Sequence, residues 1–425
     1  MKKHFFLPLF IICVTPILSA QEKDVVYVDD EECGCELVYI DGIQTTQNGE
    51  YFGFKRADGT VIVDNIYRFV DEFHGRYCKV YYDYEQCGLI NREGKEIVPP
   101  QYSDVNYPAD GLILVRDGDL YGYYDTLGNL VIPFTWRAAS GFSEGLAVVA
   151  VDFDSFYVAY GYIDRTGNIA LPAEYEYAYP FNEGYAVVKK YDRYGMIDRN
   201  GKEVLTCKYE VVSAMSNGVF FAGSSDSVRL FDSHFRPVSP AYYHGVAGFS
   251  DGLILVQRNG KYGYMNIAGK EVIPCQYDYA ILFHQGRACV SLNNKWGIID
   301  TAGNIILPIA FDNSGYRGEA YRYHDGMALV EKDEKYGFCD LEGNLVVYPC
   351  FDDAYQFSQG LAPVNLGQWG YIDTTGNFFI NPIFDMASPF EYGRAEVVYN
   401  GDVHKMDVKG RCVKNCKNAP KSWKQ

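Results

Sequence analysis

Aspartates recur along this chain in a pattern that first raises the question of acid–base catalysis. Asp300 lies in KWGIIDTAGNIILP, and residues equivalent to it occur at Asp125, Asp164, Asp198, Asp232, Asp340, Asp373 and Asp407. A general acid–base pair, or the carboxylates of a glycosidase, requires carboxyl groups in different environments. Here the aspartate returns in most repeats to the same Asp-x-x-Gly pattern, which is typical of a turn. We therefore interpret these aspartates as turn residues and predict no catalytic site.

Histidines and cysteines are the next candidates for chemistry, and their spacing does not favour a metal site. His74, His284 and His324 occupy one turn position, and no H-E-x-x-H pattern occurs. The internal cysteines, such as Cys78 and Cys289, recur at equivalent positions and suit small buried residues. No zinc-type C-x-x-C pair occurs. We predict no metal and no cofactor. The pairing of the outer cysteines stays open, including a link from Cys33 or Cys35 to Cys412 or Cys416.

The elements that position these residues repeat with a period of about 34 residues. In the segment FSDGLILVQRNGKYGYMNIAGKEVIP, Asn259-Gly260 indicates a hairpin between two strands, and Asn-x-x-Gly indicates the turn to a third. Glycines recur in three columns, represented by Gly297, Gly303 and Gly252. Because most glycines are periodic, no glycine cluster is interpreted as a phosphate loop. The 38 tyrosines and 26 phenylalanines also favour strands.

The repeats predict an all-β fold made of about eleven tandem β-meanders across residues 45–411. Two architectures fit this count: a propeller-like arrangement and an open superhelical solenoid. Runs that are apolar on both strand faces predict sheets covered on both sides by neighbouring repeats. The repeat with Val228-Arg229 in place of aromatic-Gly marks a candidate seam between two sub-arrays.

The chain ends differ from the array. Residues 1–20 combine two lysines, an apolar stretch and a small-residue end, which predicts a secretory signal peptide and an exported protein. Residues 21–44 form a lead segment, and residues 412–425 form a basic tail that we expect to be solvated. The formal net charge of −17 argues against nucleic acid as a partner. No later stretch is apolar for long enough to predict a membrane span.

The repeated motif resembles the WG (KWG) repeat of bacterial proteins. Lys295-Trp296-Gly297 and Gln368-Trp369-Gly370 carry the motif literally, and Lys261-Tyr262-Gly263 substitutes tyrosine. The resemblance covers roughly residues 45 to 411. It implies an all-β repeat fold, often in exported bacterial proteins, and brings no general set of catalytic residues.

These observations predict a non-enzymatic binding or scaffold protein of the bacterial envelope or exterior, with a protein or peptide partner. Repeat arrays present extended surfaces, and this array leaves no separate catalytic domain. The alternative is a glycan-binding protein that uses exposed tyrosine or tryptophan, and a hydrolase or lyase hidden in the array is a third reading. Periodic aromatics such as Tyr194, Tyr262 and Trp296 are interpreted as core. Aromatics in two insertions are the candidate ligand-binding residues: Phe153, Phe156, Tyr157, Tyr316, Tyr321 and Tyr323.

Overall fold

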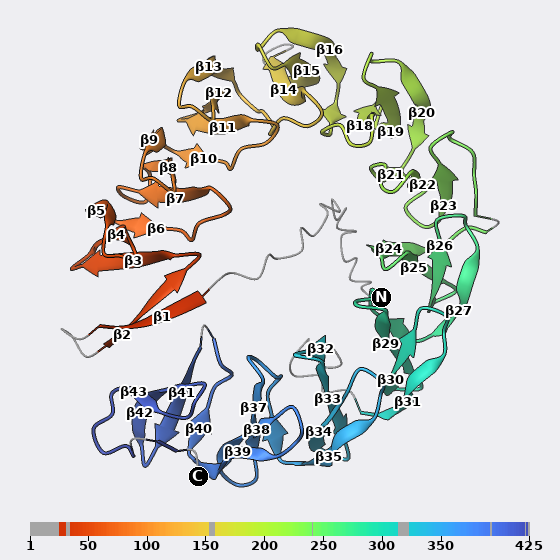
Figure 1. Cartoon of the computed structure of the whole chain (residues 1–425). Helices are drawn as coiled ribbons and strands as arrows, with labels where there is room; N and C mark the ends of the chain where they lie inside the picture. The colour runs from red at the N-terminus through yellow and green to blue at the C-terminus, as the bar shows by residue number, and fades with distance from the viewer. Residues whose placement is uncertain are drawn as a thin grey trace, which may run out of the picture. The chain divides into compact units, whose positions relative to one another are not determined.

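The computed structural model describes residues 25–30, 35–152, 158–239, 241–312, 323–391, 393–420 and 422–423. Regular structure in these ranges consists of β-strands, which form small antiparallel meanders in tandem (Figure 1). The predicted all-β repeat fold is confirmed. The chain forms two compact units, which include Leu37–Tyr242 (unit 1) and Tyr243–Gln425 (unit 2). Their boundary follows the irregular repeat that contains Arg229, where the sequence marked a candidate seam.

The strands follow the chain order within each sheet, as expected of meanders. The first sheet has the order β1-β2-β3-β4-β5 and consists of β1 (Val25–Asp30), β2 (Cys35–Ile40), β3 (Ile43–Asn48), β4 (Tyr51–Arg56) and β5 (Val61–Tyr67). The other sheets up to Tyr242 are β6 (Phe69–Val70), β7 (Tyr77–Tyr81), β8 (Cys87–Asn91) and β9 (Glu96–Tyr102); β10 (Asp104–Val105), β11 (Leu112–Asp117), β12 (Leu120–Asp125) and β13 (Leu130–Trp136); β14 (Leu146–Asp152), β15 (Val158–Asp164) and β16 (Ile169–Tyr175); β17 (Tyr177–Ala178), β18 (Tyr185–Lys190), β19 (Arg193–Asp198) and β20 (Glu203–Tyr209); and β21 (Val211–Val212), β22 (Val219–Gly223) and β23 (Val228–Asp232).

Unit 2 continues the same pattern from Tyr243 onward. Its sheets are β24 (Gly245–Ser250), β25 (Leu253–Arg258), β26 (Lys261–Asn266) and β27 (Glu271–Tyr277); β28 (Tyr279–Ala280), β29 (Arg287–Leu292), β30 (Lys295–Asp300) and β31 (Ile305–Phe311); β32 (Tyr323–His324), β33 (Met327–Lys332), β34 (Lys335–Cys339) and β35 (Leu345–Phe351); β36 (Asp353–Ala354), β37 (Leu361–Asn365), β38 (Trp369–Asp373) and β39 (Phe378–Phe384); and β40 (Met386–Ala387), β41 (Arg394–Tyr399), β42 (Asp402–Asp407) and β43 (Cys412–Lys414).

The predicted hairpin turns form where asparagine and glycine tolerate a left-handed backbone. Arg258 pairs with Lys261, so that only Asn259 and Gly260 lie between β25 and β26. Their φ angles are 52° and 75°, as a type I′ turn requires at both central residues. The local sequence therefore sets the register of this hairpin.

The glycine of the WG motif allows two backbones to approach closely. The register between β30 and β31 shifts on both sides of Ile298, which marks a bulge beside Gly297. A Cβ atom placed on Gly297 would lie 2.7 Å from the carbonyl oxygen of Leu307 and 2.8 Å from the Cα of Ile309. A side chain cannot be accommodated there without moving the third strand, so the motif requires glycine at this position.

The hydrophobic core lies between consecutive sheets. Ile298 packs in one cluster with Leu307 and Val330, whereas its neighbour Ile299 packs in another with Tyr264 and Val290. Because successive strand residues point to opposite faces, this sheet is covered on both sides. The predicted burial of both faces is confirmed here. The double coverage explains why the strands carry aliphatic runs.

Both edges of a typical sheet are blunted. The first strand is very short, as in β28 and β36, and the last strand often contains proline, as Pro133, Pro274 and Pro308 show. Short edge strands and proline, which lacks a backbone N–H, both limit pairing with a further strand. The array therefore presents few free backbone groups along these edges.

The C-terminal residues complete the last sheet instead of forming the expected solvated tail (Figure 1). β43 pairs with β42, and the Trp423 N–H donates to the carbonyl of Gly410 at 2.8 Å. The Trp423 side chain is only 4% exposed and packs against Phe384, with ring centroids 5.5 Å apart. The tail differs from the sequence expectation because an apolar side chain near its end caps the core of the last repeat.

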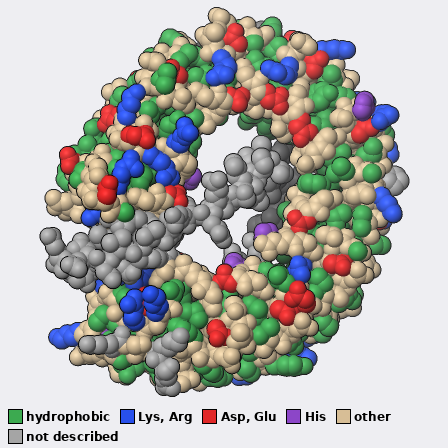
Figure 2. All heavy atoms as spheres, in the orientation of Figure 1, with side chains coloured by type: hydrophobic (Ala, Val, Ile, Leu, Met, Phe, Trp, Pro, Cys, Tyr) green, Lys and Arg blue, Asp and Glu red, His purple; other side chains and the backbone are tan. Residues whose placement is uncertain are grey.

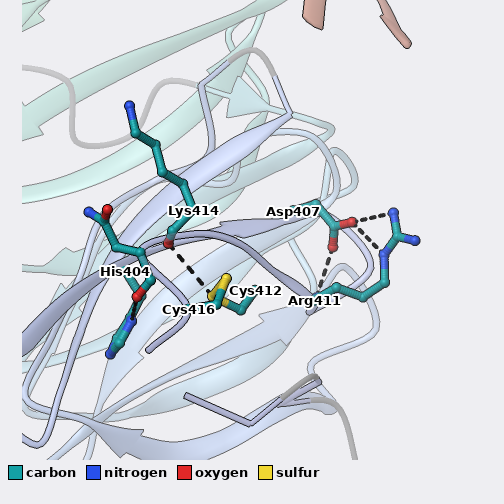
Figure 3. The surroundings of a disulfide bond; sticks show 7 residues. His404, Asp407, Arg411, Cys412, Lys414 and Cys416 are labelled. Carbon is teal, nitrogen blue, oxygen red and sulfur yellow. Dashed lines mark hydrogen bonds and ion pairs between the residues drawn. A yellow bond between two sulfur atoms is a disulfide. The ribbon is translucent and has the colours of Figure 1, made fainter. Parts of the chain in front are cut away.

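Two further contacts hold this cap. Cys412 forms a disulfide with Cys416, so the terminal cysteines pair with each other and not with Cys33 or Cys35. His404 stands where most repeats have the WG glycine, is 1% exposed, and donates from Nδ1 to the carbonyl of Asn415 at 2.6 Å (Figure 3). In other repeats the third strand passes close to the WG glycine. Here the third strand, β43, is shorter and ends opposite Lys405. The loop that follows β43 therefore covers the imidazole of His404.

Within the described residues, no helix is long and apolar enough to span a lipid bilayer. The predicted signal peptide, residues 1–20, lies outside those residues.

Candidate binding surface

The recurring aspartates close turns, as the sequence predicted. Asp300 Oδ1 accepts hydrogen bonds from the backbone N–H groups of Ala302 and Asn304 at 2.9 and 2.8 Å, and Gly303 N–H donates to the Asp300 carbonyl at 2.9 Å. The Asn304 side chain donates to Oδ2 at 2.8 Å. These bonds, led by that of the Asn304 side chain, hold the pKa of Asp300 below its usual value. The turn interpretation of this column is confirmed.

Replacing Asp300 separates turn formation from any chemical role. We expect Asp300→Ala to lower the free energy of unfolding by about 1 kcal/mol, because two backbone donors lose their acceptor. Asp300→Asn should cost less than half of this, since Asn266 Oδ1 accepts the equivalent bond from Lys270 N–H at 3.0 Å. Urea unfolding of the three proteins measures the difference. Equal losses for both substitutions would contradict the turn role.

The same column makes stability depend on pH. Hydrogen bonds to the carboxylates lower the pKa of Asp125, Asp164 and Asp300. A carboxylate whose folded pKa is depressed adds stability above its unfolded pKa, about 4, and loses it as the pH falls through the folded pKa. We expect the stability advantage of the parent over Asp300→Asn to shrink below about pH 4. Paired urea titrations at neutral and acidic pH test this, and an unchanged difference would argue against it.

Other side chains, most of them acidic, join consecutive repeats. Glu183 accepts from the backbone N–H groups of Asn217 and Gly218 at 2.7 and 2.8 Å. The same link from one turn to the next recurs at Asp110 to Gly145, Glu144 to Gly184, Asp251 to Gly286, Asp325 to Gly360 and Gln359 to Gly393. These side chains are therefore engaged in holding neighbouring turns together.

The lysine of the KWG motif is also a structural residue. Lys261 and Lys295 form ion pairs with Asp278 and Asp312, the acids that follow the third strand. Asp278 in addition accepts from Asn293 N–H, at the hairpin of the next repeat, at 2.7 Å. The lysine, the aspartate and the hairpin thus connect adjacent sheets. The recurring charged side chains therefore form contacts within the repeat array.

Only Tyr323 of the predicted ligand-binding residues lies in the described part of the chain. Phe153, Phe156, Tyr157, Tyr316 and Tyr321 fall outside the described residues. Tyr323 begins β32 and is half-buried against the cluster of Cys289 and Cys339, and the Arg287 guanidinium lies 5.7 Å from its ring centroid. Burial raises the pKa of its hydroxyl. The structure thus places Tyr323 beside the core rather than on an open surface.

The cysteines and histidines keep separate local roles. Cys78, Cys87, Cys289 and Cys339 are buried, as expected, and burial raises the pKa of Cys78 to about 12. Cys350 differs from this interpretation because it is exposed. His74 and His284 lie in exposed turns. Among the described residues, no group of three or more metal-binding side chains comes together.

An exposed aromatic hairpin in unit 1 was not predicted from the sequence. Tyr81 pairs with Cys87, so the loop Tyr82–Gln86 joins β7 and β8, whereas Asn259 and Gly260 alone join β25 and β26. Tyr84 is 87% exposed and Tyr82 is 43% exposed. We name residues 82–86 the aromatic hairpin. The signal was a longer interval between Gly75 and Gly88 than between Gly252 and Gly263.

A ring from the preceding sheet (Tyr67) and a ring from the first strand of the same sheet (Phe69) support the aromatic hairpin. Tyr82 stacks on the buried Tyr67 with ring centroids 5.5 Å apart, and Tyr84 lies against Phe69 at 4.7 Å. Within the loop, Glu85 N–H donates to Asp83 Oδ1 at 2.8 Å, and Tyr82 N–H donates to the Gln86 carbonyl at 3.0 Å. Both tyrosines are therefore held in place while their outer faces remain accessible to a partner.

A second aromatic row lies in unit 2. Tyr279 is 47% exposed and lies between Tyr262 and Trp296, with ring centroids 5.8 and 5.3 Å away. Tyr194, Tyr262 and Trp296, which the sequence assigned to the core, are half-buried. The motif aromatics therefore contribute one face to packing between repeats and leave the other partly accessible.

The charges between these features are mixed. Figure 2 shows acidic and basic side chains interspersed with hydrophobic ones over the visible surface of the chain. Exposed aromatic groups on a mixed polar surface are the usual composition of protein-binding sites. The repeated carboxylates are occupied by turns and ion pairs, whereas exposed aromatic rings remain accessible.

Comparison with known proteins identifies the repeat. A model of the WG-containing repeat matches nine stretches: residues 88–121, 121–152, 160–194, 194–222, 230–262, 262–296, 296–336, 336–368 and 369–401. No curated protein matches the sequence.

Solved structures resemble the chain only distantly. BamB from Moraxella catarrhalis is 12% identical, with 64% of this chain and 91% of that chain covered and a TM-score of 0.32. The WD40 propeller domain of Doa1 is 12% identical, with coverages of 58% and 91% and a TM-score of 0.27. The extracellular domain of a one-component system from B. thetaiotaomicron is 11% identical, with coverages of 91% and 65% and a TM-score of 0.26.

Proposed function

Because the chain belongs to the family of WG-containing repeat proteins, we propose that it is a non-enzymatic binding or scaffold protein that presents its β-repeat surface to a protein or peptide partner. The observation that carries the proposal is the use of the recurring polar residues. Asp300 closes a turn, Glu183 joins two turns, and Lys295 with Asp312 joins two sheets. Recognition is therefore left to side chains that depart from the repeat pattern.

The proposed location is the cell envelope or the exterior of a bacterium. Residues 1–20 have the charge, apolar stretch and small-residue end of a signal peptide. The disulfide between Cys412 and Cys416 fits an oxidising compartment. Fractionation of the native host, with mass spectrometry of the mature N-terminus, tests export. Retention of residues 1–20 on a cytoplasmic protein would contradict it.

The binding function is tested by cross-linking the full mature chain in native envelope preparations. Residue-level mass spectrometry should recover one partner protein whose cross-links lie at side chains outside the repeat pattern. Scattered cross-links to many abundant proteins would oppose the proposal. A hydrolase panel provides the second arm: turnover that a single carboxylate substitution abolishes would replace the scaffold function with an enzymatic one.

Glycan binding is a second candidate, favoured by the row of Tyr262, Tyr279 and Trp296. Aromatic rings stack on the apolar faces of sugars, and Tyr279 is partly exposed beside two further rings. A glycan array with the parent and Tyr279→Ala tests this use. Signals lost on substitution support it, whereas signals that persist or are absent count against it.

A further inference from the structure

We propose that the aromatic hairpin, Tyr82–Gln86, binds a peptide segment by contacting the lysine or arginine side chains of that peptide. This inference rests on the proposed binding function and specifies the chemistry of the partner. It is carried by two independent features of one loop: two accessible tyrosine rings held against other rings, and two carboxylates that form no ion pair with the described residues.

The rings supply faces for a cation. A guanidinium or ammonium group over the face of tyrosine is attracted by the ring quadrupole. Tyr82 and Tyr84 rest on Tyr67 and Phe69, with centroid separations of 5.5 and 4.7 Å. Among the described residues, no lysine or arginine lies over the ring of Tyr82 or Tyr84. Binding would therefore require little ordering of the receptor.

The acids supply the opposite charge. Asp83 and Glu85 are exposed and flank Tyr84. Neither forms an ion pair within the described part of the chain. The nearby Arg68 is neutralised by Glu50, with 2.6 Å between Nη1 and Oε2. A cation over the ring of Tyr84 thus lies beside two exposed carboxylates, and the net charge of −17 favours its approach.

A matched hairpin in unit 1 shows the difference. Tyr191 lies at the tip between β18 and β19 and is 81% exposed, about as much as Tyr84. Its neighbouring acid, Asp192, is paired with Lys189 at 2.5 Å. A cation beside Tyr191 would meet a carboxylate already neutralised, so this tyrosine serves as the control for exposure alone.

The test measures the binding of a fluorescein-labelled peptide with arginine alternating with glycine to the full mature chain by anisotropy. We expect Tyr84→Ala to weaken binding about threefold to fivefold, as for an exposed cation–π contact. Asp83→Asn combined with Glu85→Gln should weaken it about tenfold and reduce its salt dependence. Tyr191→Ala should leave binding unchanged. Because these side chains are exposed, thermal unfolding should be unaffected and serves as the folding control.

Each result decides the inference. Equal weakening by Tyr84→Ala and Tyr191→Ala, or none by either, overturns it. Displacement of the peptide by a neutral oligosaccharide would reassign the hairpin to glycans. A native partner that cross-links elsewhere and retains affinity for Tyr84→Ala would remove this site while leaving the proposed binding function in place.

Discussion

Gly297→Ala should lower the free energy of unfolding by about 3 kcal/mol, the upper end of the usual cost of overpacking. The added Cβ would lie 2.7 Å from the Leu307 carbonyl oxygen and 2.8 Å from the Ile309 Cα. Both obstacles are backbone atoms, so β31 must move away from β30. Because repeats depend on their neighbours, we expect hydrogen exchange to accelerate first in β30 and β31. Urea unfolding followed by amide exchange measures both effects.

Gly286→Ala is the matched control for Gly297→Ala. Gly286 has φ 76° and no atom within 4 Å of a hypothetical Cβ. The substitution should therefore lower the free energy of unfolding by only about 1–2 kcal/mol, the cost of placing alanine in a left-handed conformation. A clear gap between the two variants supports close backbone approach as the reason for the WG glycine. If both lose the same stability, backbone conformation alone accounts for the motif.

Trp423→Ala should destabilise the last repeat by about 3 kcal/mol or more, as for other buried large-to-small changes. The side chain is 4% exposed and packs with Phe384, Tyr399 and the His404 ring. Its loss removes the cover from the terminal cluster. We expect early exchange of amides in β42 and β43 and a lower first unfolding transition.

Two variants isolate the packing role of Trp423. Trp423→Phe keeps an aromatic ring and should recover most of the loss, because the indole nitrogen has no hydrogen-bond partner among the described residues. Lys417→Ala changes an exposed tail residue and should be neutral. A destabilising effect of Lys417→Ala equal to that of Trp423→Ala would indicate that charge, not packing, holds the tail.

The repeated part of the fold follows from the sequence because its determinants are local. Asn259-Gly260 selects a hairpin turn and Asp300 with Gly303 closes the next turn, so each can be recognised within a few residues. Gly297 could be identified as a backbone requirement, but its cause, the bulge opposite Leu307, involves a separate strand. Periodicity then extends one local solution along the array.

The binding surface was less accessible to sequence reasoning because it depends on contacts between repeats. The break of the motif at Cys87 was visible, yet the position of Tyr82 depends on its stacking with Tyr67 in the preceding sheet. Basic composition suggested a solvated tail, whereas the position of Trp423 is decided by a tertiary cluster. Motif aromatics such as Trp296 were assigned to the core because periodicity does not distinguish full burial from partial burial.

The blunted sheet edges decide how a partner can be recognised. A first strand as short as β28 and a proline such as Pro308 in the last strand leave little unpaired backbone for an incoming strand. Recognition by strand addition, in which main-chain bonds provide affinity almost regardless of sequence, is disfavoured along these edges. A ligand must instead engage side chains, which vary independently of the scaffold. Affinity and selectivity can then be altered by single surface substitutions, while the same edges discourage molecules from joining sheet to sheet.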